Sequence, residues 1–295
     1  MPSKIRKILF VDTNIWLDFY RARNEAGLQL LKRVESVSSQ IIVTFQLEIE
    51  YKKNRQAAII EGITELKPPA KIIHPGFVTD LRTTQMLSKD VETAKRRVAE
   101  LRAKLKRALI DPSRFDPVYQ TCQRIFHKDD SLVLARSSPG KLVMRRRAIR
   151  RFLHGCPPRK NGDTSFGDCF NWEWMVECAR VQNAELVIVS RDNDYGRSID
   201  DDALINDQLK QEFSERVSKK RKVLLYQKLS AALKHFSIPV SAKEQDAEID
   251  IVASSKRNFE QALSIAPPEE VARARAIIRE LLLVSGAADP GGQSG

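Results

Sequence analysis

The sequence predicts an α/β protein in which helices flank a parallel sheet and a basic helical insertion interrupts the alternation. Toward both ends of the chain, apolar runs of strand length alternate with longer segments of helical periodicity, as in proteins built from βα units. Between these two parts the alternation stops and positive charge accumulates. Of the 295 residues, 42% are hydrophobic, which is enough to form a substantial core.

The first part begins with a predicted strand over 7–12. Its residues 8–11 are a continuous apolar run, which is typical of a strand covered on both faces. A helix over 14–37, with an aromatic and leucine stripe, and a strand over 41–43 are expected next. A second helix over about 45–65 ends before Pro68 and Pro69, because proline cannot continue a helix.

Residues 67–160 are predicted to form the basic helical insertion. This range carries 23 Lys and Arg against 8 Asp and Glu, whereas the rest of the chain carries 27 against 30. Charged helices are expected over 85–109 and 141–154, the second ending at Gly155. A positive excess confined to one third of the chain indicates a polyanionic partner such as a nucleic acid.

The βα pattern resumes after the insertion, so residues 1–66 and 161–237 are expected to fold together as one core. The elements predicted there are a helix over 167–182, a strand over 185–190, a helix over 201–217, a strand over 223–226 and a helix over 227–236. Residues 238–295 are expected to form a mostly flexible tail with one helix near 268–284.

Several classes of protein do not fit the composition. No stretch approaches the roughly 20 apolar residues of a membrane span, and the N-terminus lacks the apolar region of a signal peptide. A cytoplasmic protein without a membrane partner is therefore expected. The cysteines and histidines lack metal-ligand spacing, which argues against a zinc site or a Cys–His nucleophile.

Acidic residues follow the predicted strands where those strands leave the sheet. Asp12 ends the first strand, Asp192 and Asp194 follow the strand over 185–190, and Asp168 begins a helix. Glu50 lies on the helix after the second strand. Ligand sites gather at the carboxyl ends of parallel strands, and clustered carboxylates repel one another without a cation. Mg²⁺ or Mn²⁺, which prefer oxygen ligands, are the expected cofactors.

Three short motifs resemble the acidic signatures of PIN-domain nucleases. They are Val-Asp-Thr-Asn at 11–14, Gly-Asp at 167–168 and Ser-Arg-Asp-Asn-Asp-Tyr at 190–195. The stretch from Pro157 through Glu173 and the Lys219–Lys222 run resemble a longer PIN-like subgroup. The likeness covers about 4–66 and 155–237, roughly half of the chain.

The resemblance implies a Rossmann-like or flavodoxin-like sheet and a metal-dependent endoribonuclease that cleaves RNA with metal-activated water. Matching the motifs implies that Asp12, Asp168 and Asp192 are catalytic metal ligands, with Asp194 as a further acid. Asn14 and Ser190 are expected to hold the carboxylates or a bound water in place.

The fourth acidic position is either Glu48 or Glu50. Two residues apart on a helix, their side chains point about 200° from each other, so both cannot enter one site. Glu50 shares its stripe with Leu47, Asn54 and Ala57, and is therefore preferred as a catalytic residue and metal ligand.

The helix over 141–154 and the residues after it are predicted to bind RNA. Arginine suits bidentate contacts with phosphate, and acidic residues do not occur between 141 and 160. The residues expected to contact RNA are Arg145, Arg146, Arg147, Arg150, Arg151, Arg159 and Lys160. Some of these side chains have the alternative of pairing with acids of the core.

Two other functions fit the same features. One is a metal-dependent DNA nuclease of the flap or 5′-exonuclease type, which shares the sheet and the acidic site. The other is a non-catalytic RNA-binding protein with a degenerate PIN domain. The sequence leaves open the RNA target, the number of metals, the oligomeric state, and whether a protein inhibitor or a second copy binds the chain.

Overall fold

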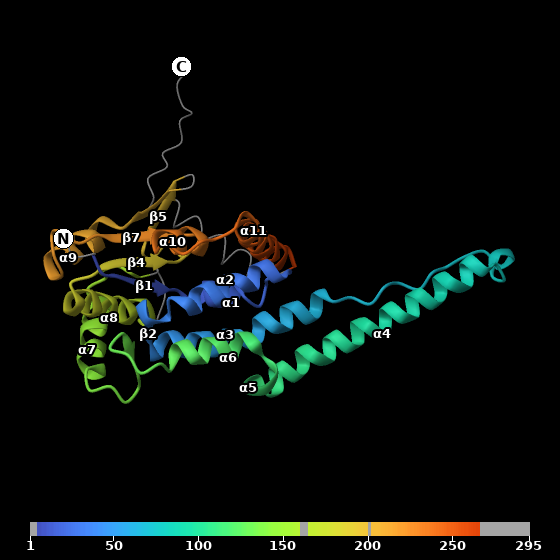
Figure 1. Cartoon of the computed structure of the whole chain (residues 1–295), viewed down its shortest axis with the longest axis horizontal. Helices are drawn as coiled ribbons and strands as arrows, with labels where there is room; N and C mark the ends of the chain where they lie inside the picture. The colour runs from blue at the N-terminus through green and yellow to red at the C-terminus, as the bar shows by residue number, and fades with distance from the viewer. Residues whose placement is uncertain (1–4, 160–164, 200–201, 266–295) are drawn as a thin grey trace, which may run out of the picture.

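A five-stranded parallel sheet lies at the centre of the protein, in a computed structural model that describes residues 5–159, 165–199 and 202–265. The strand order is β3-β2-β1-β4-β7, and every neighbouring pair is parallel (Figure 1). The strands are β1 (Lys7–Val11), β2 (Ile41–Thr44), β3 (Val133–Leu134), β4 (Glu185–Val189) and β7 (Val223–Tyr226). The predicted α/β class with a parallel sheet is confirmed.

The central strands β1 and β4 place the two most important acidic loops side by side. After their first residues, Lys7 and Glu185, both strands consist of apolar residues that are buried on both faces, as the uninterrupted hydrophobic runs predict. Their register aligns Val11 with Val189, so both strands end at the same edge of the sheet. The amide of Asp12 continues this pairing by donating to the carbonyl of Val189 at 3.0 Å.

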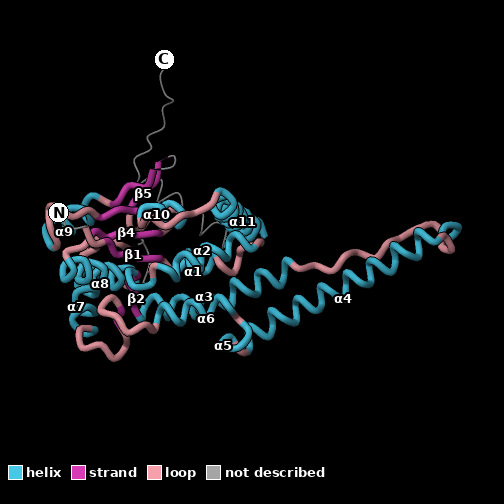
Figure 2. The backbone as a smooth tube through the Cα atoms, in the orientation of Figure 1, coloured by secondary structure: helices cyan, strands magenta, loops and turns pink. Residues whose placement is uncertain are grey.

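Helices pack against the sheet in two groups. Helix α8 (Gly167–Gln182) contacts β2 and β4, and α9 (Asp207–Arg216) lies against α8. Helix α2 (Glu25–Ser36) contacts both α6 (Pro117–Phe126), which packs on β2, and α10 (Leu229–His235), which packs on β4 and β7. Figure 2 shows these helices enclosing the strands.

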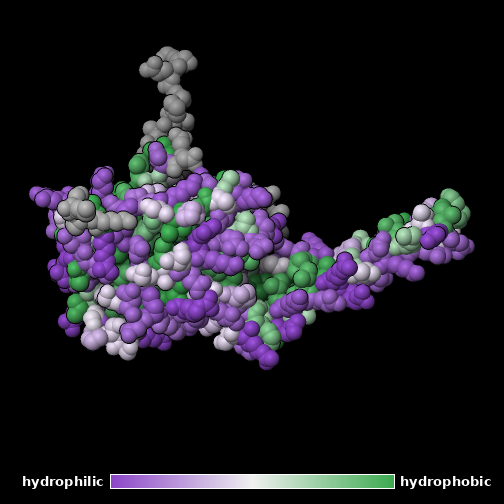
Figure 3. Space-filling model, in the orientation of Figure 1, coloured by the Kyte–Doolittle hydropathy of each residue, from purple (hydrophilic) through white to green (hydrophobic). Residues whose placement is uncertain are grey.

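A long arm projects from this body (Figure 1). It consists of the end of α3 (Phe45–Glu65), a connection that includes η2 (Gly76–Val78), and α4 (Arg82–Ile110). Apolar side chains gather at its far end (Figure 3). In the connection between α3 and α4, Ile73 is 94% exposed and Phe77 is 87% exposed. The arm contains the predicted helix over 85–109, which extends a few residues further at its N-terminus.

The rest of the range 67–160 differs from the expected helical insertion, because it joins the body. Strand β3 pairs with β2, and α6 contributes Val118, Cys122, Ile125 and Phe126 to the main core. Helix α7 (Lys141–Leu153) packs along α8, and α5 (Pro112–Phe115) connects α4 to α6. Strand β3 has only two residues, too few to produce the alternation by which a strand is recognised.

A buried ion pair fixes the base of the arm. Arg55 on α3 donates through Nε and Nη2 to Asp116 Oδ2 at 2.9 and 2.6 Å, and also to the carbonyl of Ala108 at the end of α4. The hydroxyl of Tyr20 donates to the same carboxylate oxygen at 2.8 Å. These contacts connect α3, α4 and α6, and a buried pair of this kind tolerates the loss of neither partner.

Two predicted helices are shorter than expected. The helix predicted over 14–37 is divided into α1 (Thr13–Asp18) and α2, because the side chain of Asn24 caps a new helix by accepting from the amide of Gly27. The helix predicted over 201–217 begins only at Asp207, where Asn206 is the cap. In front of it lies an antiparallel hairpin of β5 (Gly196–Ile199) and β6 (Asp202–Ile205).

The residues after 238 begin with a helix that packs on the body. In α11 (Ala242–Ile265), Ala247 and Ile251 are buried, and the helix contacts α2 and α10. The carboxylate of Glu248 accepts from the amides of Leu229 and Ser230 at the start of α10. The predicted helix near 268–284 lies outside the described residues. Among the helices that are described, none combines the length and the apolar character needed to cross a bilayer.

Candidate active site

Asp12 occupies the centre of the candidate site. It caps α1, and its side chain is only 4% exposed. Its Oδ1 accepts from the amide of Thr13 at 2.7 Å, and its Oδ2 accepts from Asn14 Nδ2 at 3.1 Å and from Ser190 Oγ at 2.6 Å. Asn14 and Ser190 thus hold the carboxylate in place, as the sequence suggested for these two side chains.

The charge of Asp12 is unfavourable in this surrounding. The pKa of Asp12 is raised from 3.8 to about 7, chiefly by burial, then by the neighbouring charge of Asp192, with a smaller contribution from Glu50. The hydrogen bonds from Ser190 and Thr13 act in the opposite direction but do not compensate. A buried carboxylate among other carboxylates is stabilised by a nearby cation.

Glu50, and not Glu48, faces Asp12. The carboxylate of Glu50 accepts from Thr13 Oγ1 at 3.2 Å and from Gln46 Nε2 at 2.9 Å. Glu48 instead pairs with Lys52 at 2.6 Å and with His127 at 2.8 Å. The helical geometry therefore separates the two side chains in the way the sequence predicted.

Gly167 brings Glu50 close to the start of α8. A Cβ atom at this position would collide with Glu50 Oε1, so the approach of the carboxylate to the backbone requires glycine. The next residue is Asp168, which lies half-buried in the first turn of α8. An acid in this position interacts favourably with the helix dipole.

The loop after β4 supplies the remaining acids. The amide of Asp192 donates to Ser190 Oγ at 3.1 Å, so one hydroxyl connects this loop to Asp12. Arg191 forms an ion pair with the buried Asp18 on α1, which anchors the loop from the other side. Asp192 and Asp194 are both half-buried.

Tyr195 is a site residue that the sequence analysis missed. It is fully buried, and its hydroxyl has no hydrogen-bond partner among the described residues. Burial raises its pKa well above 10, and the next contributions come from four acids, Asp168, Asp12, Glu50 and Asp194. The hydroxyl therefore lies within electrostatic range of acids from four different elements. A tyrosine after a strand resembles a core residue, so only the fold identifies its surroundings.

The donor chemistry of the site suits a hard divalent cation. All candidate ligands are carboxylate oxygens, and Asn14 Oδ1 is buried without a partner among the described residues. Within that same part of the chain, no three His, Cys, Asp or Glu side chains already have the arrangement of a metal-ion centre. The carboxylates of Asp12 and Glu50 are oriented by the hydrogen bonds that they accept from Thr13, Ser190, Gln46 and Asn14.

The predicted RNA-binding arginines of α7 fall into two groups. Arg145, Arg146 and Arg150 are exposed, and none of them forms an ion pair with a described residue. Arg159 is also exposed and lies over the ring of Phe152, at 4.3 Å from its centroid. Arg147 is exposed but donates to Glu177 at 3.2 Å. Lys160 lies outside the described residues.

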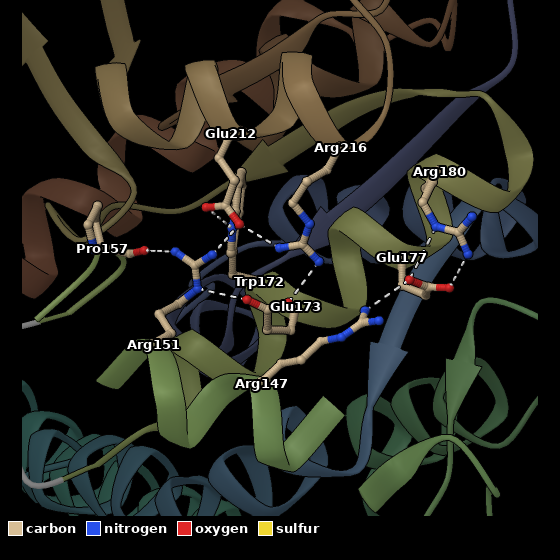
Figure 4. A network of polar contacts seen from close by, with 9 residues as sticks. All are labelled: Arg147, Arg151, Pro157, Trp172, Glu173, Glu177, Arg180, Glu212 and Arg216. Carbon is tan, nitrogen blue, oxygen red and sulfur yellow. Dashed lines mark hydrogen bonds and ion pairs between the residues drawn. The ribbon is translucent and has the colours of Figure 1, made fainter. Parts of the chain in front are cut away.

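Arg151 is a correction to the sequence prediction, because it faces the core and does not reach the surface. Its side chain is 8% exposed and forms ion pairs with Glu173 on α8, at 2.9 Å, and with Glu212 on α9. Arg216 completes the network by donating to Glu173 at 2.8 Å and to Glu212 at 2.5 Å (Figure 4). Two arginines and two glutamates therefore alternate between α7, α8 and α9.

Comparison with known proteins gives one match. A family model described as a PIN domain matches residues 9–195, which is more than half of the chain and spans Asp12, Glu50, Asp168 and Asp192. No curated protein and no solved structure matches the sequence.

Proposed function

Because this chain belongs to the PIN-domain family, whose members are generally nucleases, we propose that it is a metal-dependent endoribonuclease. The observation that carries the proposal is the convergence of acids from four elements on one edge of the parallel sheet. Asp12 and Glu50 are joined through Thr13, and Asp12 and Asp192 are joined through Ser190. Asp168 stands beside Gly167, against which Glu50 lies.

In this proposal, Asp12, Glu50, Asp168 and Asp192 hold Mg²⁺ or Mn²⁺, with Asp194 as a further ligand or an outer acid. A divalent ion bound here supplies Lewis acidity, which activates water and stabilises charge on the phosphate under attack. The cation also compensates the burial and the repulsion by Asp192 that raise the pKa of Asp12. Ser190 and Asn14 keep Asp12 oriented, since both donate to its Oδ2.

Tyr195 has a separate role in the proposed site. Its raised pKa keeps the hydroxyl protonated at neutral pH, so it acts as a hydrogen-bond donor and not as a base. A buried donor that has no partner among the described residues is costly in the free protein. Donation to a carboxylate or to a phosphate oxygen of the substrate removes this cost. The hydroxyl therefore gains its acceptor when metal and substrate are bound.

The basic surface of α7 supports a nucleic-acid substrate. Arg145, Arg146 and Arg150 present guanidinium groups that form no ion pair with a described residue, and their helix packs directly along α8, which carries Asp168 at its start. Arg147 and Arg159 extend the same charge. Phosphate contacts of this kind provide affinity without sequence information, and the choice of RNA over DNA rests on the likeness to endoribonucleases.

One digestion experiment tests the proposal against its rivals. Single-stranded RNA, single-stranded DNA and flap DNA are incubated with the wild type and with Asp168→Asn, in Mg²⁺, Mn²⁺ or EDTA. We expect internal cleavage of RNA, dependence on metal, and loss of cleavage but not of RNA binding in the variant. Preferred cleavage of flap DNA would favour the DNA nuclease. RNA binding without cleavage of any substrate would favour a non-catalytic RNA-binding protein.

A further inference from the structure

A groove of about 740 Å³ lies between the β5–β6 hairpin, α9 and the outer side of β7. Strand β7 is at the edge of the main sheet, and β6 packs beside it but belongs to a separate two-stranded sheet. The groove is lined along the whole of β7, from Lys222 before the strand to Lys228 after it. At about 3.3 Å per residue this is a length of roughly 20 Å.

Both walls of the groove are connected to the acidic site. At the end of β7, the carbonyl of Tyr226 accepts from the amide of Ser190 at 3.0 Å, and the hydroxyl of Ser190 donates to Asp12. On the other wall, β5 begins directly after Tyr195, whose carbonyl accepts from the amide of Asn206 at 2.9 Å. One end of the groove therefore adjoins the loop that carries Asp192.

The rim of the groove is basic. Lys210 on α9, together with Lys219 and Lys222 before β7, is exposed and forms no ion pair with a described residue. Arg221 also lines the groove but donates to the backbone and side chain of Asn183. The acidic lining residues that are described are Asp202 and Asp207, fewer than the basic ones.

The interior of the groove is less polar than its rim. Leu204 is 52% exposed and Leu225 is buried. Tyr226 also lines the groove, and its half-buried ring lies against His235 of α10, with 5.9 Å between the ring centroids. Lysines along an apolar channel with an aromatic ring suit a ligand that alternates phosphates with flat apolar bases. Duplexes expose their phosphates but keep their bases stacked inside, so a single strand fits better.

We propose that this groove binds single-stranded nucleic acid and leads one end of the strand to the acidic site. This proposal rests on the proposed nuclease function, because only that function gives the bound nucleic acid a reason to extend to the acidic site. The lysines of the rim contact phosphates, and the exposed side chain of Leu204 and the exposed part of the Tyr226 ring contact bases. An acidic peptide shares the charge but lacks bases, and its binding is an outcome of the test.

The test compares two double variants of the full chain. Lys219→Glu/Lys222→Glu changes the groove, and Lys32→Glu/Lys243→Glu makes the same charge change at exposed lysines of α2 and α11. Binding of a fluorescent single-stranded 12-nucleotide RNA is measured by anisotropy in EDTA, which prevents cleavage. Circular dichroism and thermal melting verify that both variants are folded.

We expect the groove variant to raise Kd for the RNA at least about 10-fold and to reduce the salt dependence of binding by more than one phosphate contact. The control variant should change Kd less than about 2-fold. Equal affinities of the two variants would overturn the proposal. So would displacement of the RNA by polyglutamate as effectively as by unlabelled RNA, because that result assigns the groove to acidic peptides.

Crosslinking locates the strand independently of affinity. RNA with a single 4-thiouridine is irradiated on the wild type, and the modified peptides are identified by mass spectrometry. Crosslinks within 202–228 are expected, and crosslinks confined to α7 would contradict the groove. Failure of the nuclease function looks different: the wild type then cleaves no RNA, yet the groove variant still loses affinity. If RNA is cleaved equally by all variants, the function stands and the groove does not.

Discussion

Ser190 donates its hydroxyl to Asp12 Oδ2 at 2.6 Å and accepts the amide of Asp192 at 3.1 Å. These residues follow two neighbouring strands, β1 and β4, and are separated by about 180 positions in the chain. A single hydroxyl thereby fixes the relative positions of two acids that repel each other. In the absence of a metal ion, this hydroxyl therefore holds Asp12 and the loop of Asp192 in place.

The first prediction concerns this hydroxyl. Ser190→Ala removes a hydrogen bond that lowers the pKa of Asp12, and it frees the loop that carries Asp192. We expect the Mg²⁺ concentration for half-maximal cleavage to rise about 10-fold or more, the usual effect of losing a residue that orients a metal ligand. Metal titrations of cleavage measure this, with the exposed Ser36→Ala as the control. An unchanged metal requirement would contradict the role of Ser190.

A second prediction follows from the raised pKa of Asp12. Because its folded-state pKa of about 7 lies above the ordinary 3.8, the folded protein binds more protons than the unfolded chain between these values. Stability in EDTA therefore falls as the pH rises from about 4 to 7, by up to about 4 kcal/mol for this group. Asp12→Asn should abolish this part of the decline.

Thermal melts from pH 5 to pH 8 measure the effect, with and without Mg²⁺. Added Mg²⁺ should raise the melting temperature of the wild type at pH 8 more than that of Asp12→Asn, because a ligand that binds the folded state stabilises it. Parallel pH profiles of the two proteins would argue against a strained carboxylate at this position.

The third prediction separates the two glutamates of α3. Glu50→Gln removes a proposed metal ligand, so cleavage should fall about 100-fold or more, beyond the usual loss for an outer residue. Glu48→Gln affects only the contacts with Lys52 and His127 on the surface and should retain activity within about 2-fold. Cleavage rates at saturating Mg²⁺ provide the comparison. A larger loss of cleavage in Glu48→Gln than in Glu50→Gln would identify Glu48 as the metal ligand.

The fourth prediction distinguishes a buried arginine from an exposed one on the same helix. Arg151→Met leaves Glu173 and Glu212 without one of their two cationic partners, and should lower the free energy of unfolding by about 3–5 kcal/mol. Arg146→Met should leave stability unchanged and weaken RNA binding. Urea denaturation and anisotropy measure the two quantities. If Arg151→Met were fully stable but bound RNA more weakly, Arg151 would have to be assigned to RNA binding and not to the stability of the fold.

The network around Arg151 also predicts that the folded protein loses stability in acid, which urea denaturation at several pH values measures. Burial alone would raise the pKa of Glu212, but hydrogen bonds and charges of Arg151 and Arg216 outweigh it and lower the pKa. The contribution of this carboxylate to stability is therefore present above about pH 4.3, its unfolded value, and is lost as the pH falls through the lower folded value.

Much of the acidic site follows from local sequence. The apolar run before Asp12 predicts a buried strand, and the similar run before Ser190 predicts another, so the two loops were expected at one edge of the sheet. Helical periodicity alone predicted that Glu50, and not Glu48, faces the site, and the contacts of the two side chains agree. Strand and helix periods are properties of the backbone, which is why a single sequence reveals them.

Other features depended on contacts between distant segments. The sequence left Arg151 and Arg146 equivalent, and only the packing of α7 along α8 and α9 turned Arg151 toward Glu173. The two residues of β3 became a strand because β2 offered an edge, and Tyr195 joined the site because four elements place acids around it. The sequence by itself determined which residues end strands and which share a helix face. The tertiary structure decided which charges are buried, because burial depends on partners that no local pattern specifies.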